Sequence, residues 1–220
     1  MSALSLLDYA SVLIFALTGA LAASRKQLDL VGFAFLACLT AVGGGTLRDV
    51  LLDRNPVFWI GNPGYIGIAC AAAAVIFVTA HLAESRYRWL LWLDSFALAV
   101  AVAAGVAAAL TMVQPWPIIV IMGILTGCAG GLMRDVVCNE VPLVLTQGEL
   151  YVSAAFAGSL LAAGLAALTS DMTVILGGCA VLTWTLRAGS LAFAGLSGAP
   201  AQRLINFSWS SRSGKSKSAG

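Results

Sequence analysis

The chain has 220 residues, of which 60% are hydrophobic and only 10% are charged, and its formal net charge is +2. A typical soluble domain is about 45–50% apolar and about 25% charged, so this composition excludes an ordinary water-soluble domain. The small net charge gives no reason to expect a nucleic-acid partner. The sequence therefore predicts an integral membrane protein, in which the positions of the few charges carry the information.

Seven apolar runs follow one another along the chain, and each has between 18 and 25 residues. At about 1.5 Å per residue such runs span roughly 27–37 Å, enough for a hydrocarbon core of about 30 Å. The runs are too continuous for the alternating pattern of a transmembrane barrel. We therefore expect an all-α membrane protein with seven transmembrane helices, at residues 6–23, 30–52, 64–82, 89–112, 116–138, 150–168 and 172–196.

The rest of the chain consists of short connections and a polar tail. We expect one transmembrane domain over residues 1–197 and a disordered cytoplasmic tail over residues 198–220. The spacing of His, Cys and carboxylate residues matches no catalytic or metal site, so we expect no catalytic residue, no metal and no cofactor. His81 reads as an interfacial polar residue. The five cysteines read as small packing residues, and they are Cys38, Cys70, Cys128, Cys138 and Cys179.

The Lys and Arg residues are distributed unevenly between the two sides of the predicted membrane domain. One set of alternate connections holds only Arg54, and the other set with the tail holds eight basic residues. The positive-inside rule then places the N-terminus outside and the tail in the cytoplasm. The eight residues are Arg25, Lys26, Arg86, Arg88, Arg203, Arg212, Lys215 and Lys217, and Arg48, Arg134 and Arg187 lie within spans.

An offset of 86 residues reveals an internal duplication. Besides Leu39/Leu125 and Val50/Val136, the identical pairs include Asp8/Asp94, Gly19/Gly105, Thr40/Thr126, Gly44/Gly130, Gly45/Gly131, Arg48/Arg134, Asp49/Asp135, Pro56/Pro142 and Tyr65/Tyr151. Most of these identities fall on Gly, Pro, Arg and Asp rather than on the abundant Ala and Leu, which chance apolar similarity would favour. Each copy holds three spans, an odd number, so the second copy must be inverted in the membrane. We expect repeat one over about residues 5–82, repeat two over about residues 89–168 and a seventh helix at 172–196.

A glycine cluster lies in the second span of each repeat, and it consists of Gly43, Gly44 and Gly45 in the first and of Gly130 and Gly131 in the second. Consecutive glycines are poor helix formers, and a kink at this depth exposes carbonyl oxygens that can bind a cation. The alternative is close helix packing through small residues, which is the expectation for single glycines such as Gly105 and Gly164. We favour a functional break at the two clusters.

Each cluster is followed by adjacent Arg and Asp residues, and charged residues within spans usually face the interior of the bundle. Adjacent residues on a helix do not face each other, so each arginine is expected to find its partner elsewhere. Similar depths in the membrane suggest the ion pairs Asp8–Arg48 and Asp94–Arg134. The alternative for the two arginines is that they reach to the lipid headgroups. Arg187 has no assigned role.

A duplicated three-span unit with GGGxxRD and GGxxRD, followed by a seventh span, resembles the prokaryotic trimeric intracellular cation channels. The same unit is also described as a glycine transporter domain, and the resemblance covers about residues 5–197. It implies a homotrimer with a potassium pore in each protomer, lined by the second and fifth helices. Two departures are Ala129, which replaces the first glycine in the second repeat, and the absence of lysine from the spans.

We therefore expect a potassium channel of a prokaryotic inner membrane rather than an enzyme, with membrane lipids, monovalent cations and copies of itself as partners. The alternative is a carrier for glycine or another small zwitterion, which needs a similar polar break at the midplane. The expected ion pathway consists of Gly43, Gly44, Gly45, Gly130, Gly131, Thr40, Thr126, Asp49 and Asp135. The residues expected to support it as charge pairs are Arg48, Asp8, Arg134 and Asp94.

Overall fold

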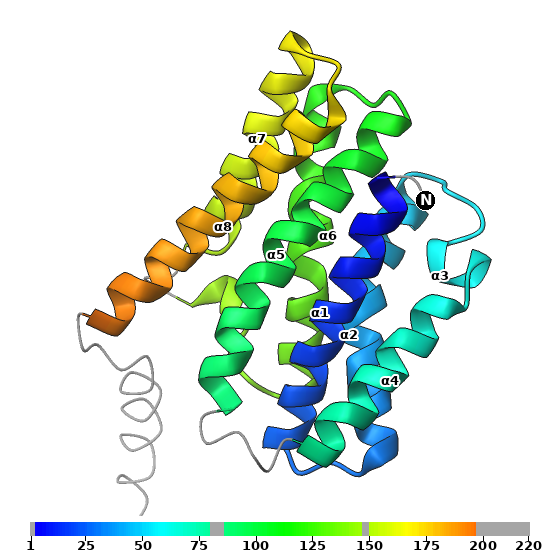
Figure 1. The fold of residues 1–220 in the computed structure, drawn as a ribbon, viewed down its shortest axis with the longest axis vertical. Helices are drawn as coiled ribbons and strands as arrows, with labels where there is room; N and C mark the ends of the chain where they lie inside the picture. The colour runs from blue at the N-terminus through cyan, green and yellow to red at the C-terminus, as the bar shows by residue number, and fades with distance from the viewer. Residues whose placement is uncertain (1–2, 80–85, 147–149, 197–220) are drawn as a thin grey trace, which may run out of the picture.

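A computed structural model describes residues 3–79, 86–146 and 150–196, and these residues form a bundle of helices (Figure 1). Its elements are α1 (Ala3–Arg25), α2 (Leu30–Leu51), α3 (Phe58–Gly61), α4 (Gly64–Thr79), α5 (Arg86–Thr111), α6 (Trp116–Val137), the short 3-10 helix η2 (Leu143–Leu145), α7 (Val152–Leu168) and α8 (Met172–Leu196). His81 and the predicted tail over residues 198–220 lie outside the described residues.

The predicted all-α membrane fold is confirmed, because a long helix occupies each of the seven predicted spans. Five helices have the length and apolar composition to cross a membrane, namely α1, α2, α5, α6 and α8. The described parts of α4 and α7 are apolar but shorter, with 16 and 17 residues. Helices of this length reach roughly 24–26 Å, and a bilayer accommodates the deficit by local thinning.

Two short helices, α3 and η2, are absent from the prediction. Each follows one of the two prolines that the 86-residue offset pairs, Pro56 and Pro142. Both helices are too short to show an apolar periodicity, so hydrophobic patterning cannot detect them.

The two repeats are inverted relative to each other, as predicted. Figure 1 shows that α1 and α5, the first helices of the two repeats, run in opposite directions. The backbone repeats in detail as well, because positive φ angles occur at Gln27 and Val113 and at Asp53 and Asn139, each pair 86 residues apart. These residues lie just beyond the ends of α1, α5, α2 and α6, where a left-handed residue commonly terminates a helix.

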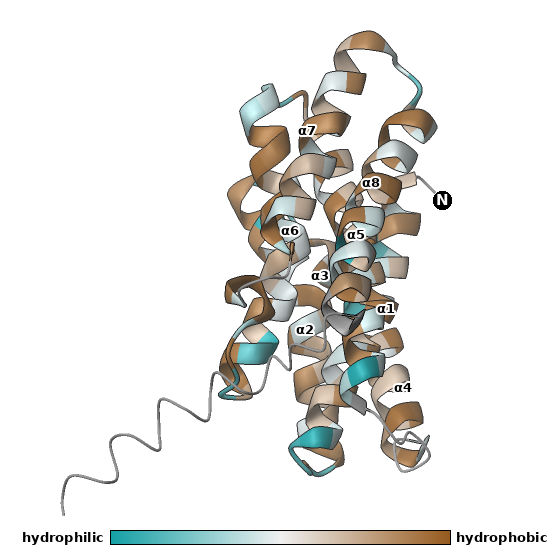
Figure 2. Ribbon diagram, turned by 90° about the vertical axis from the view of Figure 1, so that its left-hand side faces the viewer, coloured by the Kyte–Doolittle hydropathy of each residue, from teal (hydrophilic) through white to brown (hydrophobic). Residues whose placement is uncertain are grey.

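Four helices form the centre of the bundle, with α1 packed on α2 and α5, and α6 packed on α2 and α5. α4 covers α1 and α2, whereas α7 and α8 cover α5 and α6 between them. Hydrophobic residues extend along most of each helix (Figure 2). Phe35, Val78 and Val181 are examples of large apolar side chains that are 60%, 66% and 63% exposed, as expected where lipid is the solvent.

Small residues allow the central helices to approach closely. A Cβ atom added to Gly19 would lie 2.7 Å from the carbonyl oxygen of Leu36, and one added to Gly105 would collide with the equivalent oxygen of Met122. The predicted packing role is therefore confirmed for Gly105. It is wrong for Gly164, where an added Cβ would meet no described atom within 4 Å.

This difference provides a matched test of helix packing. We expect Gly105→Ala to lower the free energy of unfolding by about 1–3 kcal/mol, because the added methyl group overpacks the contact between α5 and α6. Gly164→Ala adds the same atom at an open position and gains helix propensity, so it is expected to be neutral or slightly stabilising. Thermal unfolding in detergent measures both, and equal melting temperatures for the two variants would contradict this packing.

Candidate functional site

The centre of the molecule is the crossing of α2 and α6 at Gly44 and Gly130. A Cβ atom added to Gly130 would lie 2.5 Å from the carbonyl oxygen of Thr40, and one added to Gly44 would collide with that of Thr126. Gly44 is equivalent to Gly130 and Thr40 to Thr126, so the symmetry of the repeats turns each contact into the other. The pseudo-two-fold axis of the repeats therefore passes through the crossing. Each carbonyl oxygen lies against a glycine Cα atom, a geometry that favours weak Cα–H···O contacts between helices.

The structure contradicts the predicted helix break at the glycine clusters. α2 and α6 continue without interruption through Gly43, Gly44 and Gly45 and through Gly130 and Gly131. Their carbonyl groups are not released to bind a cation in this conformation. Close packing, the alternative considered above, accounts for Gly44 and Gly130, and at both positions even alanine is too large.

The flanking glycines of the clusters make separate contacts. Gly45 faces the ring of Phe58, and a Cβ atom added to Gly45 would lie 2.6 Å from that ring. Gly43 faces the flexible side chain of Met133, and a Cβ atom added to Gly43 would lie 2.6 Å from its sulfur atom. Gly131 is next to the hydroxyl group of Tyr151, at 3.1 Å from an added Cβ. The glycine clusters therefore accommodate side chains from the rest of the bundle beside the helix crossing.

The two threonines at the crossing use their hydroxyl groups within their own helices. Thr40 donates a hydrogen bond of 2.6 Å to the carbonyl oxygen of Leu36, and Thr126 donates one of 2.6 Å to that of Met122. Bonds of this kind, from a hydroxyl group to the carbonyl four residues earlier, often bend helices. In this conformation both hydroxyl protons have a partner, which leaves their oxygen lone pairs available to a ligand.

At the end of the bundle where α1 begins, Arg48 and Asp8 form the ion pair that the sequence predicts. Arg48 Nη1 lies 2.8 Å from Asp8 Oδ1, and Nη2 donates a second hydrogen bond of 3.4 Å to Oδ2. Both residues are buried, with exposures of 0% and 4%. The ion pair and its hydrogen bonds offset the cost of removing the arginine charge from water inside a membrane protein.

At the opposite end, Arg134 and Asp94 form the second predicted pair. Arg134 Nη1 lies 2.8 Å from Asp94 Oδ1, and both residues are fully buried. The pair is less complete than its equivalent, because Asp94 Oδ2 and Arg134 Nη2 have no hydrogen-bond partner among the described residues. The two ends of the bundle therefore contain equivalent ion pairs, but the pair of the second repeat makes fewer hydrogen bonds.

The expectation that adjacent Arg and Asp residues do not meet is wrong in both repeats. Arg48 Nε donates a hydrogen bond of 2.8 Å to Asp49 Oδ1, and Arg134 Nε donates one of 2.8 Å to Asp135 Oδ1. The long arginine side chain can turn back along its helix, a freedom that residue spacing alone does not capture. Each guanidinium group thus binds two carboxylates.

The second carboxylate of each cluster also fixes the connection that follows its helix. Asp49 Oδ2 accepts a hydrogen bond of 2.9 Å from the backbone N–H of Phe58, at the start of α3. Asp135 Oδ2 accepts one of 2.9 Å from the N–H of Leu143, at the start of η2. The prediction missed this role of the RD motif, although the paired prolines before both elements mark the equivalent connections.

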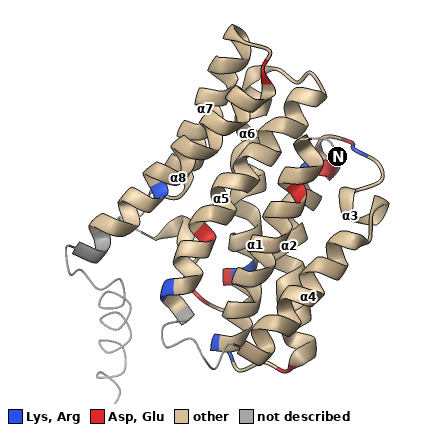
Figure 3. Ribbon diagram, viewed as in Figure 1, with Lys and Arg blue, Asp and Glu red and all other residues tan. Residues whose placement is uncertain are grey.

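Charged residues are sparse along the helices (Figure 3). Beyond the end of α6, Glu140 lies 3.0 Å from Arg25 Nη1 and 3.1 Å from Lys26 Nζ, so it links the two repeats. The residue equivalent to Glu140 in the first repeat is Arg54, whose Nη1 lies 3.4 Å from Asp49 Oδ1. The duplicated connections therefore carry opposite charges at the same position.

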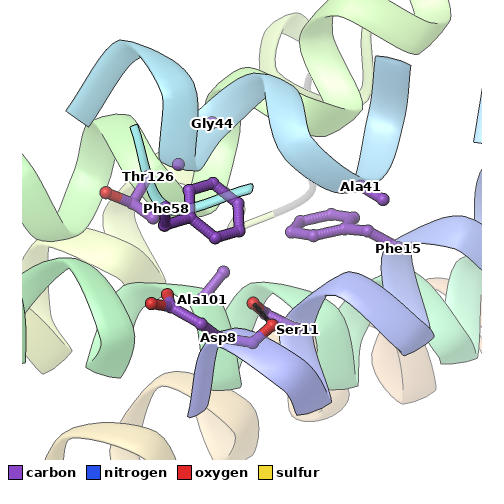
Figure 4. Close-up of a pocket in the computed structure, with 9 residues that line it drawn as sticks. Asp8, Ser11, Phe15, Ala41, Gly44, Phe58, Ala101 and Thr126 are labelled. Carbon is purple, nitrogen blue, oxygen red and sulfur yellow. Dashed lines mark hydrogen bonds between the residues drawn. The ribbon is translucent and has the colours of Figure 1, made fainter. Parts of the chain in front are cut away.

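A small cavity lies between the crossing and the Asp8–Arg48 pair (Figure 4). Its volume is about 10 Å³, about the minimum that holds one water molecule. Figure 4 shows the rings of Phe15 and Phe58 between α1 and α2, with Asp8 and Ser11 on α1. The lining residues are Asp8, Ser11, Phe15, Ala41, Gly44, Gly45, Phe58, Ala101 and Thr126.

The cavity includes three of the residues assigned to the ion pathway from the sequence, namely Gly44, Gly45 and Thr126. The other six assigned residues do not line it, and they are Thr40, Gly43, Gly130, Gly131, Asp49 and Asp135. Sequence reasoning missed Phe15, because an aromatic residue is unremarkable in an apolar span, and it missed Phe58, which lies in the connection between the second and third predicted spans. Arg187, which had no assigned role, is fully buried with its guanidinium carbon 4.9 Å from the ring centre of Tyr151.

A double-mutant cycle tests the buried pair of the second repeat. Arg134→Ala removes the partner of Asp94 and is expected to lower the free energy of unfolding by about 3–5 kcal/mol. The double variant with Asp94→Asn removes both charges of this pair, so part of the loss is expected to return. Thermal unfolding in detergent measures the cycle, and strictly additive losses would show that the two charges do not interact.

The fold and the site define an integral membrane protein built from two inverted three-helix repeats and a seventh helix. A family model described as "Glycine transporter" matches residues 5–81 and, independently, residues 91–167. The chain belongs to the family that this model describes. The two matches also establish the duplication at the level of sequence.

Named membrane proteins and solved structures are similar to this chain over most of its length. The UPF0126 membrane protein of Vibrio cholerae is 36% identical over 86% of this chain and 80% of its own. The UPF0126 inner membrane protein YadS of Escherichia coli K12 is 37% identical over 70% of this chain and 74% of its own. A trimeric intracellular cation channel orthologue from Rhodobacter sphaeroides is 38% identical, with a TM-score of 0.85 over 88% of this chain and all of that chain.

A second solved structure, of a TRIC cation channel, is 29% identical and has a TM-score of 0.77 over 87% of this chain and 94% of that chain. The relatives are named membrane proteins and the solved structures are named channels. This agrees with the expectation that the chain is not an enzyme.

Proposed function

We propose that the chain is a monovalent-cation channel, with potassium as its main permeant ion, and that it assembles as a homotrimer with one pathway in each protomer. The likeness to the orthologue from Rhodobacter sphaeroides, which extends over all of that chain, supports the channel and its trimeric state. The observation in this molecule that carries the proposal is the cavity beside the crossing of the inverted repeats, since it places the carboxylate of Asp8 next to a polar space inside the bundle.

The proposed pathway follows the space between α1, α2, α5 and α6. On the Asp8 side of the crossing, oxygen atoms of Asp8, Ser11 and Thr126 can replace part of the water around a cation. The ring of Phe15, which also lines the cavity, lies 3.8 Å from the position of an added Cβ on Gly130. The residue equivalent to Phe15 in the second repeat is Ala101, so Phe15 occupies space that symmetry would leave open. This conformation is therefore closed.

The description of the family model makes a glycine carrier the second candidate. A zwitterion carrier needs a cationic group for the substrate carboxylate, and helix N-termini or arginines supply it in known transporters. Arg48 is fully engaged by Asp8 and Asp49, so at the cavity it offers no free guanidinium edge. The cavity lining offers carboxylate and hydroxyl oxygen atoms but no free cationic group, which favours a cation over a zwitterion.

Recording from purified protein in a planar bilayer under a potassium chloride gradient separates the two candidates. A channel is expected to give discrete current steps whose reversal potential has the sign of the potassium gradient. A carrier turns over too slowly to give such steps, and instead accumulates radiolabelled glycine in proteoliposomes. Glycine uptake without current steps would overturn the proposal.

Phe15→Ala tests the proposed pathway. Because the ring closes the space beside Gly130, its removal is expected to raise potassium flux into proteoliposomes severalfold, at a stability cost of about 3–5 kcal/mol. Leu13→Ala is the matched control, since Leu13 lies on the same helix but is 44% exposed. It should leave the flux unchanged. Unchanged flux in folded Phe15→Ala would place the pathway elsewhere.

We also propose an inner-membrane location with the N-terminus outside and the C-terminus in the cytoplasm. The name of the Escherichia coli relative supports the location, and the eight-to-one distribution of basic residues supports the orientation. A reporter fused after Gly220 is expected to be cytoplasmic, and a tag inserted in the connection around Arg54 is expected to be external. Both signals on one side of the membrane would contradict this orientation.

A further inference from the structure

Two cysteines on neighbouring membrane-spanning helices have no part in the proposed pathway. Cys38 on α2 and Cys70 on α4 face each other, with their Sγ atoms 3.8 Å apart in an S–H···S contact. Cys70 is exposed on the surface of the bundle, whereas Cys38 is half-buried behind it. The other three cysteines, Cys128, Cys138 and Cys179, are buried.

The position of the pair determines which reagents can reach it. Cys38 lies about 12 Å along α2 from Leu30, and Cys70 lies about 9 Å along α4 from Gly64, so both thiols lie at the depth of the lipid chains. A water-soluble oxidant or thiol is scarce at this depth. An oxidant dissolved in lipid can meet the exposed Cys70 first.

The geometry also restricts what the pair can become. A disulfide requires the sulfur atoms to approach by about 1.8 Å, and rotation about the Cα–Cβ bonds of an exposed and a half-buried side chain moves sulfur atoms over distances of this size. Among the described residues, no group of three or more His, Cys, Asp or Glu side chains could hold a metal ion, so the pair lacks the ligands of a zinc site. A disulfide is electrically neutral and apolar, so it suits a lipid environment.

We infer that Cys38 and Cys70 form an oxidation site for lipid hydroperoxides, in which the two thiols become a disulfide that ties α2 to α4. In the first step the sulfur of Cys70 takes the terminal peroxide oxygen, the O–O bond breaks, and the thiol proton leaves with the alkoxide as an alcohol. In the second step the sulfur of Cys38 attacks that of the Cys70 sulfenic acid, the S–S bond forms, and the hydroxyl group leaves with the Cys38 proton as water. The two thiols lose two electrons in total and the hydroperoxide gains them.

This inference is independent of the ion or solute that the protein transports, because it rests on the contact between the two helices. The cross-link would join α2 to α4, a helix that packs on α1, α2 and α3 in the described part of the chain.

The test uses the full chain in proteoliposomes exposed to cumene hydroperoxide, a lipid-soluble hydroperoxide. Free thiols measured after denaturation with a maleimide reagent are expected to fall from five to three per chain. Mass spectrometry is expected to show a peptide that joins Cys38 to Cys70, and tributylphosphine should restore all five thiols. The same concentration of hydrogen peroxide, which partitions poorly into lipid, should act more slowly.

Two variants assign the steps to individual residues. Cys38→Ser removes the second thiol, so Cys70 is expected to accumulate as a sulfenic acid that dimedone labels. Cys70→Ser removes the exposed thiol, so the remaining four thiols are expected to survive the treatment. Disulfide-linked protomers, oxidation spread over the buried cysteines, or a Cys70 that stays reduced would each overturn the inference.

Discussion

Two helices can bring the carbonyl oxygen of one against the Cα atom of the other only where no side chain stands between them. Gly44 and Gly130 satisfy this condition at the crossing of α2 and α6, each beside a threonine carbonyl of the other helix. Since the contact lies on the pseudo-two-fold axis, it fixes how the two repeats meet. The cavity, the ring of Phe15 and the buried charges at both ends take their positions from that approach.

The buried charges follow from a second constraint, since a membrane interior offers no water to solvate them. Arg48 and Arg134 each bind two carboxylates, one from the first helix of the repeat and one from the next residue in sequence. The adjacent carboxylate also holds the connection that follows the helix. Each arginine thereby joins a helix, its neighbour and a connecting segment, so these clusters organise both ends of the bundle.

The sequence is sufficient to predict the seven helices, the inverted duplication and the pairs Asp8–Arg48 and Asp94–Arg134, because each depends on hydropathy or on the 86-residue offset. It is not sufficient to predict the state of the glycine helices. Glycine weakens a helix and also permits close packing, and only the position of Thr126 against Gly44 decides between these effects. Residue spacing also does not encode side-chain conformation or tertiary placement. The hydrogen bond from Arg48 to Asp49 and the cation–π contact between Arg187 and Tyr151 depend on both.

The reciprocal form of the central crossing has a consequence for the origin of the fold. Each helix contributes the same two groups to the contact, namely a glycine and the carbonyl group of the threonine four residues before that glycine, and each glycine meets the threonine carbonyl of the other helix. A single three-helix chain could therefore make the contact with a second copy of itself inserted in the membrane in the opposite orientation. Fusion of two such copies through one connection accounts for the present chain, and it freed the halves to diverge, as Phe15 differs from Ala101 and Arg54 from Glu140.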